Sequence, residues 1–139
     1  EAKKIIRICA DNPFIDSEFL DDLVIKFKYR IYDYGFNHQS KLNYKCVDGF
    51  GAEIINFDTL KKISKTKNKY FREHVTSGIW NNLKKYKIQF IKPKKKYQKL
   101  NIRYDIDTKQ DLNNIRAFVK KNRINLLTSA SSIVSSNKY

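Results

Sequence analysis

The stretch KIIRICADNPFIDSEFLDDLVIKF, residues 4–27, decides the fold class because it joins two elements with different periodicities. The β-branched run over residues 4–9 predicts a strand, which the turn residues ADNP end. Asp16 or Ser17 can then cap a helix, whose apolar residues recur at helical spacing as far as about Tyr29. A strand followed by a short turn and an amphipathic helix is typical of α/β proteins.

The remainder of the chain repeats this alternation of strands and helices. Strands are predicted at residues 32–36, 49–57, 87–91 and 101–106, and helices are expected to begin near Asp58, Ser77 and Thr108. Thr108 and Asp111 have the spacing of a capping box, and that last helix should end near Asn122. We expect one α/β domain over residues 1–124, with a mostly parallel or mixed sheet and flanking helices, followed by a frayed Ser-rich tail over residues 125–139.

The composition favours a folded basic domain. The 139 residues include 29 Lys and Arg against 14 Asp and Glu, which gives a net charge of +15, and 41% of the residues are hydrophobic. That charge attracts nucleic acid, anionic membranes or phosphorylated ligands, but solvating surface lysines explain it as well. Tyr97 within the basic run 92–99 permits a basic nucleic-acid-binding domain. Because no RNP, KH or helix-turn-helix pattern is present, nucleic acid is not an expected partner.

Features of a membrane or secreted protein are missing from the sequence. The chain contains no run of about 18 apolar residues, and its opening residues lack the apolar region of a secretory signal. Cys9 and Cys46 form no CxxC pair and have no metal-site spacing. We therefore expect a soluble cytoplasmic protein without a membrane partner.

Two aspartates occupy positions that suit ligand binding. Asp11 follows the first predicted strand, and Asp107 follows the last one. Ligands of open α/β sheets bind beyond the carboxyl ends of the strands, where two carboxylates can meet. Such a pair suits Mg²⁺, which typically takes one or two protein carboxylates together with substrate phosphates. Alternatively, each aspartate only caps the turn that follows it.

Four separated stretches together resemble a known family. They are IRICADNPFID at residues 6–16, VDGFGAEIINFDTL at 47–60, FREHVTSGIW at 71–80 and IRYDIDTKQDL at 102–112. In this order they are similar to the later part of cytidylyltransferases of the spore-coat polysaccharide type, relatives of the CMP-Kdo and acylneuraminate cytidylyltransferases. The resemblance implies the C-terminal portion of a nucleotide-diphospho-sugar transferase (GT-A-like) fold. It also implies transfer of CMP from CTP to a sugar or sugar acid, for surface polysaccharide or glycan biosynthesis, by a homodimer.

The resemblance also implies roles for individual residues. Asp11 and Asp107 match the catalytic acids that hold Mg²⁺. For Arg72 and His74 of the REHV block, the resemblance implies either substrate binding or a dimer contact. It implies substrate-binding roles for Asp48, Gly49 and Glu53 of a D-G-x-x-x-E block. Two positions depart from the family pattern, since Lys109 replaces a Pro and Asp105 replaces a Thr. We assign no ligand role to His38, which has no acidic or cysteine neighbour in the sequence.

The family's CTP-binding loop has no counterpart in this sequence. Family members begin with a strand and an Arg- and Gly-rich loop that binds the triphosphate, whereas the glycines here are Gly35, Gly49, Gly51 and Gly78. None of them belongs to a Gly-rich phosphate-binding loop before a helix. We therefore expect the chain to be the C-terminal part of such an enzyme, with doubtful activity in isolation. The alternative is a non-catalytic remnant that acts as a binding or assembly module.

Overall fold

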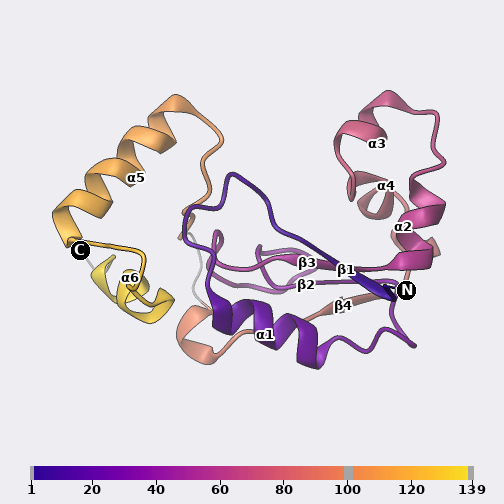
Figure 1. The fold of residues 1–139 in the computed structure, drawn as a ribbon, viewed down its shortest axis with the longest axis horizontal. Coiled ribbons are helices and arrows are strands. Elements are labelled where there is room, and N and C mark those ends of the chain that lie inside the picture. Colours follow the sequence, from indigo (N-terminus) through magenta and orange to yellow (C-terminus); the bar gives the residue numbers. More distant parts are fainter. Residues whose placement is uncertain (1, 99–101, 138–139) are drawn as a thin grey trace.

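The computed structural model describes residues 2–98 and 102–137, and a four-stranded mixed sheet lies at its centre (Figure 1). The strands are β1 (Lys4–Arg7), β2 (Tyr34–Phe36), β3 (Glu53–Asn56) and β4 (Ile88–Phe90), in the spatial order β1-β3-β2-β4. Strand β3 is antiparallel to both β1 and β2, while β2 and β4 are parallel. The expected mixed sheet is confirmed, and the mostly parallel alternative is wrong because two of these three pairings are antiparallel.

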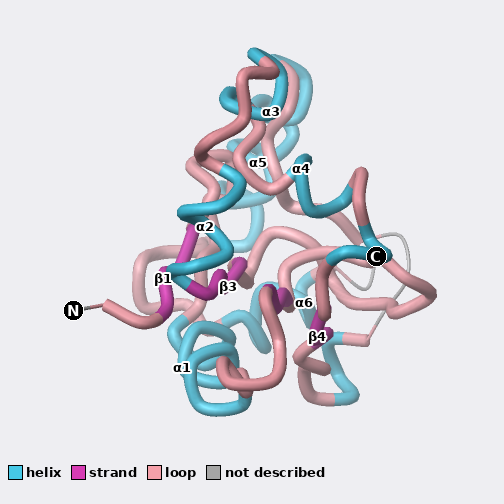
Figure 2. Tube along the Cα trace, turned by 90° about the vertical axis from the view of Figure 1, so that its right-hand side faces the viewer, coloured by secondary structure: helices cyan, strands magenta, loops and turns pink. Residues whose placement is uncertain are grey.

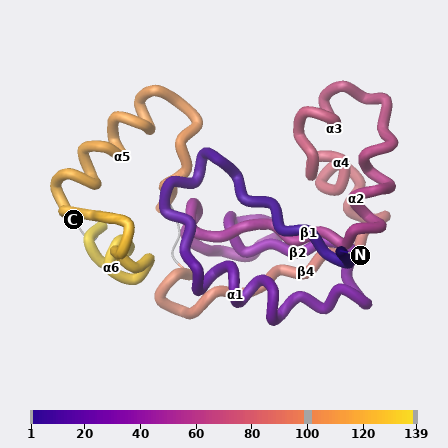
Figure 3. The backbone as a smooth tube through the Cα atoms, viewed as in Figure 1, coloured from indigo at the N-terminus to yellow at the C-terminus, as the bar shows by residue number. Residues whose placement is uncertain are grey.

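Helices flank the sheet on one face and at both ends. They are α1 (Ser17–Lys26), α2 (Phe57–Ile63), α3 (Lys69–Glu73), α4 (Ser77–Trp80), α5 (Lys109–Asn122) and α6 (Ala130–Ser136), with 3-10 turns η1 (Leu83–Lys85) and η2 (Lys95–Tyr97). Helix α1 lies below the strands in both Figure 1 and Figure 2. Helices α2 to α4 lie at the end where the chain begins, and α5 and α6 lie at the opposite end (Figure 3). None of the described helices is both long and apolar enough to span a membrane.

The apolar core consists of three clusters that fix these elements. Leu23 and Phe27 from the α1 region pack with Ile54 of β3 and Ile91 after β4, which attaches α1 to the sheet. A second cluster surrounds Tyr34, Phe36, Ile55 and Ile79. The third joins Phe19, Val47, Phe50, Tyr97 and Tyr104 to the apolar residues of α6. Burial of these side chains provides the main stabilising free energy of the fold.

The prediction of a frayed Ser-rich tail is wrong for residues 130–136, which form helix α6. The Ser129 side chain caps this helix by accepting a hydrogen bond from the Ser132 amide. Ala130, Ile133 and Val134 are at most 4% exposed and face the third cluster. Their i, i+3, i+4 spacing places them on one face of the seven-residue helix, where they form a narrow apolar stripe.

Local signals predicted the helix ends with mixed success. Asp16 caps α1 as expected, and the capping box of Thr108 and Asp111 begins α5, which ends at Asn122. Helix α2 begins at Phe57 with Asn56 as its N-cap, so the prediction that Asp58 caps it is wrong. The helix predicted to begin near Ser77 is divided into the short helix α4 and the 3-10 turn η1.

The strand predicted at residues 101–106 is not formed by residues 102–106, and residue 101 lies outside the described residues. This segment is instead held by single hydrogen bonds to separate loops. The amide of Asp48 donates to the carbonyl oxygen of Ile102 at 3.1 Å, and the amide of Ile106 donates to that of Asp11 at 2.8 Å. Because these partners belong to different segments, no continuous ladder forms.

Candidate functional site

A cavity of about 600 Å³ brings together residues from three separated parts of the chain. It is lined by Cys9, Asp11, Asn12, His38, Gln39, Ser40, Cys46, Asp48, Ile102, Arg103, Asp105 and Asp107. We call it the acidic cavity, because aspartates are the most frequent residues in its lining. Its walls come from the loop after β1, the segments around β2 and β3, and the extended segment before α5.

The structure places Asp11 and Asp107 on this one cavity. The hydrogen bond from the Ile106 amide to the Asp11 carbonyl oxygen holds their two segments side by side. On the other flank, the carboxylate of Asp111 accepts from the amides of Asp107 and Thr108 at 3.2 and 2.8 Å. These hydrogen bonds fix the backbone of Asp107 just before the N-cap residue of α5, Thr108. Both aspartate side chains are exposed to solvent, and their catalytic and metal-binding roles stay predictions.

Asp48 and Gly49 lie next to these aspartates and have different surroundings. Asp48 lines the acidic cavity. Gly49 is buried and has a φ of 99°, in the left-handed region that favours glycine. A Cβ atom there would lie 2.9 Å from Cβ of Tyr104 and 3.1 Å from its carbonyl carbon. Gly49 thus allows the segment before α5 to pass close behind the cavity wall, and it is not among the lining residues.

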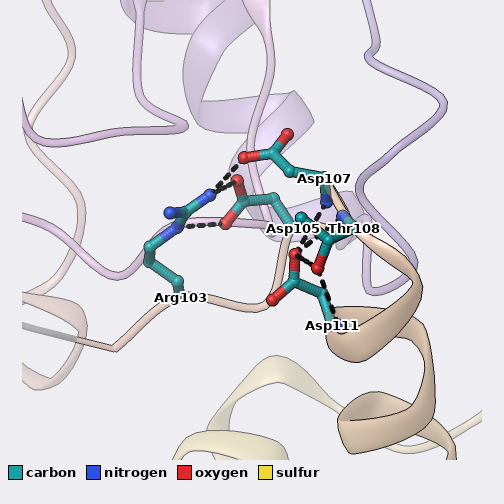
Figure 4. A network of polar contacts seen from close by, with 5 residues as sticks. All are labelled: Arg103, Asp105, Asp107, Thr108 and Asp111. Atoms are coloured by element: carbon teal, nitrogen blue, oxygen red, sulfur yellow. Dashed lines mark hydrogen bonds and ion pairs between the residues drawn. The ribbon is translucent and has the colours of Figure 1, made fainter.

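Arg103 partly neutralises the carboxylates of the cavity. Its guanidinium donates to both carboxylate oxygens of Asp105 and, at 2.6 Å, to Asp107 (Figure 4). The hydrogen bonds from Arg103 lower the pKa of Asp105. Arg103 was missed by the sequence analysis. The alternation R-x-D-x-D was the available signal, because residues i, i+2 and i+4 of an extended segment share one side.

Asp48 remains short of compensating positive charge. Burial raises the pKa of its carboxyl to about 7, and the charge of Asp105 contributes in the same direction. A hydrogen bond from the Gly49 amide and the charge of Arg103 oppose this shift only in part. Asp48 therefore exchanges a proton near neutral pH, inside a cavity with three other carboxylates. An added cation would be attracted to this position.

The residues present fit a magnesium ion that arrives with a phosphate ligand. Carboxylate oxygens are the ligands that Mg²⁺ prefers, and the Asp11 and Asp107 side chains are accessible on one cavity. Within residues 2–98 and 102–137, no group of three or more His, Cys, Asp or Glu side chains could hold a metal ion. A magnesium ion held by Asp11 and Asp107 would have to take its remaining ligands from phosphate and water.

A second hollow of about 290 Å³, which we call the smaller cavity, adjoins the first. It is lined by Arg7, His38, Gln39, Lys41, Glu53, Tyr70, His74, Thr76, Ser77, Trp80 and Asn81. His38 and Gln39 line both cavities, so these two residues mark their boundary. The smaller cavity combines two aromatic side chains with hydroxyl, amide and charged groups, so it offers hydrogen-bonding partners to a small polar molecule.

Glu53 is the buried acid of the smaller cavity, with an exposed fraction of 1%. Its carboxylate accepts from Arg7 and from the Tyr34 hydroxyl at 2.5 Å each, and from the Thr76 hydroxyl at 3.0 Å. Burial acts to lower the pKa of Arg7, but the hydrogen bond and charge of Glu53 outweigh it and raise that pKa. Glu53 is thus fully hydrogen-bonded within the protein, in a position that stiffens the cavity floor.

Arg72 and His74 of the REHV block lie apart from the acidic cavity. His74 is the C-cap of α3, and its ring centroid lies 4.5 Å from that of Tyr70 at the smaller cavity. Arg72 is exposed on α3 and lines neither cavity. The structure therefore divides the sequence-predicted residues into two groups. Asp11, Asp48 and Asp107 share the acidic cavity, while Glu53 and His74 share the smaller one.

Comparisons with known proteins agree on one family. The family model described as cytidylyltransferase matches residues 1–133. The spore coat polysaccharide biosynthesis protein SpsF of Bacillus subtilis is 33% identical over 119 residues, which cover 84% of this chain and 47% of SpsF. An uncharacterized protein of Methanocaldococcus jannaschii is 35% identical over 108 residues, which cover 77% of this chain and 42% of that protein.

A solved structure has the same fold. The cytidylyltransferase from Leptospira borgpetersenii aligns with a TM-score of 0.73 at 25% sequence identity, covering 96% of this chain and 54% of that chain. The chain thus spans about half the length of the proteins that it matches.

Proposed function

Since the chain belongs to the cytidylyltransferase family, we propose that it forms part of an enzyme that transfers CMP from CTP to a sugar or sugar acid. The observation that carries this proposal is the placement of Asp11 and Asp107 on one acidic cavity beside Asp48. The name of the related SpsF protein favours a product used in surface polysaccharide biosynthesis. In the reaction, a hydroxyl oxygen of the acceptor bonds to the α-phosphorus of CTP and its proton passes to solvent. The bond from that phosphorus to the leaving pyrophosphate breaks.

The acidic cavity is the proposed site of the triphosphate and its cation. Asp11 and Asp107 would hold Mg²⁺, which supplies charge neutralisation at the reacting phosphate when it is bound. Arg103 already holds the carboxylates of Asp105 and Asp107 in place. Its guanidinium can also donate to phosphate oxygens, because an arginine has five N–H donors. Asp111 fixes the start of α5 and thereby the backbone of Asp107.

The smaller cavity is the proposed acceptor site. It adjoins the acidic cavity through His38 and Gln39, so an acceptor bound there can present a hydroxyl to the nucleotide. Glu53 and Thr76 stiffen its floor through their hydrogen bond of 3.0 Å. His74 lines its rim and is available to a polar substituent of the acceptor. Such positioning of two reactants lowers the entropic part of the barrier.

Binding of CTP tests the proposal directly. The full gene product is titrated with CTP by calorimetry in the presence of Mg²⁺ and in the presence of EDTA. We expect heat of binding that depends on Mg²⁺, together with weaker binding of ATP under the same conditions. Incubation with CTP, Mg²⁺ and a sugar acid should then release pyrophosphate. If no metal-dependent heat is measured with any nucleotide, the enzyme proposal fails and the binding or assembly module replaces it.

A further inference from the structure

His38 lies at the boundary of the two cavities, two residues after the end of strand β2. It lines both the acidic cavity and the smaller cavity. Its backbone position is fixed by the neighbouring Asn37, whose side-chain amide donates to the Phe19 carbonyl oxygen at 2.7 Å and whose side-chain oxygen accepts from the Ala52 amide at 3.0 Å. The imidazole also packs edge-to-face on the Phe36 ring, with centroids 6.2 Å apart. The ring is therefore held in place at the boundary.

One ring nitrogen of His38 has no hydrogen-bond partner within the part of the chain that the structure describes. His38 is 7% exposed, and its Nδ1 atom has no hydrogen-bond partner among the described residues. A buried polar atom without a partner is destabilising and is rare in folded proteins. A ligand hydroxyl that reached this nitrogen, after a small rotation of the imidazole, would supply the missing hydrogen bond. His38 was assigned no ligand role from the sequence, because its missing partner is visible only in the folded chain.

The charge state of the His38 imidazole restricts which chemical groups of a ligand can hydrogen-bond to it. Burial lowers the pKa of His38, and the charges of Lys41 and Arg7 lower it further, against the opposing charges of Glu53 and Asp11. The neutral imidazole carries one donor and one acceptor nitrogen. A hydroxyl group both donates and accepts, so it satisfies either nitrogen. A phosphate oxygen only accepts, and a cationic group only donates.

We propose that His38 binds the acceptor sugar, with a ring nitrogen hydrogen-bonded to a hydroxyl group of that sugar at the boundary of the two cavities. This inference rests on the proposed function and adds a substrate-binding residue to it. The aromatic side chains of Tyr70 and Trp80 also line the smaller cavity. Flat apolar rings beside polar groups match a sugar, which presents apolar C–H faces and polar hydroxyl groups.

Steady-state kinetics of His38 variants of the full gene product test this inference. His38→Phe keeps an aromatic ring but removes both nitrogens, whereas His38→Asn removes the ring and keeps a polar atom near the position of Nδ1. We expect His38→Phe to raise KM for the acceptor roughly 3- to 10-fold, as for one lost hydrogen bond, with KM for CTP within about twofold of wild type. His38→Asn should recover part of this loss. A purely structural role predicts the opposite order, because Phe fills the space better than Asn.

The control variant is Lys45→Gln, which changes an exposed residue near the same loop that lines neither cavity. Its KM values for CTP and for the acceptor should equal those of the wild type. If His38→Phe raises both KM values equally, or if His38→Asn is more impaired than His38→Phe, the inference is overturned.

A second measurement detects the contact without turnover. The protein has two histidines, so imidazole ¹⁵N resonances of His38 are assigned by their loss in His38→Asn. With Mg²⁺ and CTP bound, N-acetylneuraminate, 3-deoxy-D-manno-octulosonate and N-acetylglucosamine are added in turn. At least one of these sugars should shift the His38 resonances. If CTP binds and none of the three sugars shifts the His38 resonances, the inference about His38 is wrong while the proposed function stands. If CTP does not bind, the proposed function fails and the inference falls with it.

Discussion

The amide of Ile106 donates a hydrogen bond of 2.8 Å to the carbonyl oxygen of Asp11, and this bond joins the two acidic segments of the molecule. One segment follows β1 near the start of the chain, and the other precedes α5 near its end. A backbone hydrogen bond between two loops fixes their separation more firmly than side-chain contacts do, since it leaves few rotatable bonds. The carboxylates of Asp11 and Asp107 thereby share one cavity although they are distant in the sequence.

Replacing either of these aspartates by asparagine should abolish activity and leave the fold intact. Asp11→Asn and Asp107→Asn each remove a charged oxygen ligand of the proposed magnesium ion, so we expect turnover to fall by a factor on the order of 100 or more. Both side chains are exposed, so the melting temperature should change little. Pyrophosphate release by the full gene product and thermal unfolding measure the two effects.

The matched control for these variants is Asp58→Asn, an exposed aspartate in the first turn of α2 that does not line the acidic cavity. Its activity should equal that of the wild type. Near-normal turnover of Asp107→Asn at limiting Mg²⁺ would show that the metal assignment is wrong.

Asp48 should make the free energy of unfolding depend on pH. The folded-state pKa is raised to about 7 from 3.8, so the folded state binds more protons than the unfolded state between these values. The stabilising contribution of this proton is complete below pH 4 and is lost as the pH rises to 7. We therefore expect Asp48→Asn to be more stable than the wild type at pH 8, by roughly 1–2 kcal/mol after solvent screening, and the difference to vanish at pH 4. Urea unfolding at both pH values measures this.

Substitution of the neighbouring Asp105 tests independently why the pKa of Asp48 is raised. Because the negative charge of Asp105 contributes to the raised pKa of Asp48, Asp105→Thr should lower that pKa. A ¹³C titration of the Asp48 carboxyl follows the change. The control is Lys109→Pro, a change in the first turn of α5. Lys109 does not contribute to the raised pKa of Asp48, so this variant should leave the pKa of Asp48 unchanged. An unaltered Asp48 titration in Asp105→Thr would contradict the electrostatic explanation.

Signals confined to one turn of helix allowed correct predictions from the sequence. The capping box of Thr108 and Asp111 and the Asp16 cap depend only on residues within one turn, and both are present in the structure. Strand β1 was also predicted, because a β-branched run favours a strand whichever strand it pairs with. Helix α6 was missed, although Ala130, Ile133 and Val134 have helical spacing, since the surrounding serines dilute the apolar pattern.

Features that depend on tertiary contacts were predicted wrongly or not at all. The segment 102–106 is apolar enough to indicate a strand, but its backbone partners belong to two different loops. Arg103 became a site residue only through its contacts with two aspartates in the folded chain. That a His38 nitrogen lacks a partner among the described residues likewise depends on what surrounds it in the fold. A sequence pattern specifies which groups are present, and it does not specify which groups lack a partner.

Gly49 should tolerate no side chain. Its positive φ is unfavourable for other residues, and a Cβ would approach Cβ of Tyr104 to 2.9 Å. We expect Gly49→Ala to destabilise the protein by about 1–3 kcal/mol, measured by chemical unfolding. Gly78 in α4 is the matched control, because a Cβ there meets no atom within 4 Å. Gly78→Ala should be neutral or slightly stabilising, and equal effects of the two substitutions would refute the steric argument.

Helix α6 should contribute to the stability of the domain. Ile133 is 3% exposed and packs in the cluster that contains Tyr97, Tyr104 and Phe50, so Ile133→Ala removes buried methyl groups. We expect a loss of about 2–4 kcal/mol in the free energy of unfolding. Ser135→Ala, at an exposed position of the same helix, should change it by less than about 0.5 kcal/mol. If both variants unfold like the wild type, α6 is not part of the cooperative unit.

The buried carboxylate of Glu53 should be coupled energetically to Arg7. Glu53→Gln leaves the guanidinium of Arg7 without its negative partner and places an amide against the hydroxyl donors of Tyr34 and Thr76. We expect a destabilisation of about 2–4 kcal/mol. In the double variant with Arg7→Met, the loss should be smaller than the sum of the two single losses, because the unpaired charge is removed as well. The exposed surface pair of Lys94 and Glu18 is the control, and Lys94→Gln should leave the free energy of unfolding nearly unchanged. Additive losses for Arg7 and Glu53 would show that their contact does not stabilise the floor of the smaller cavity.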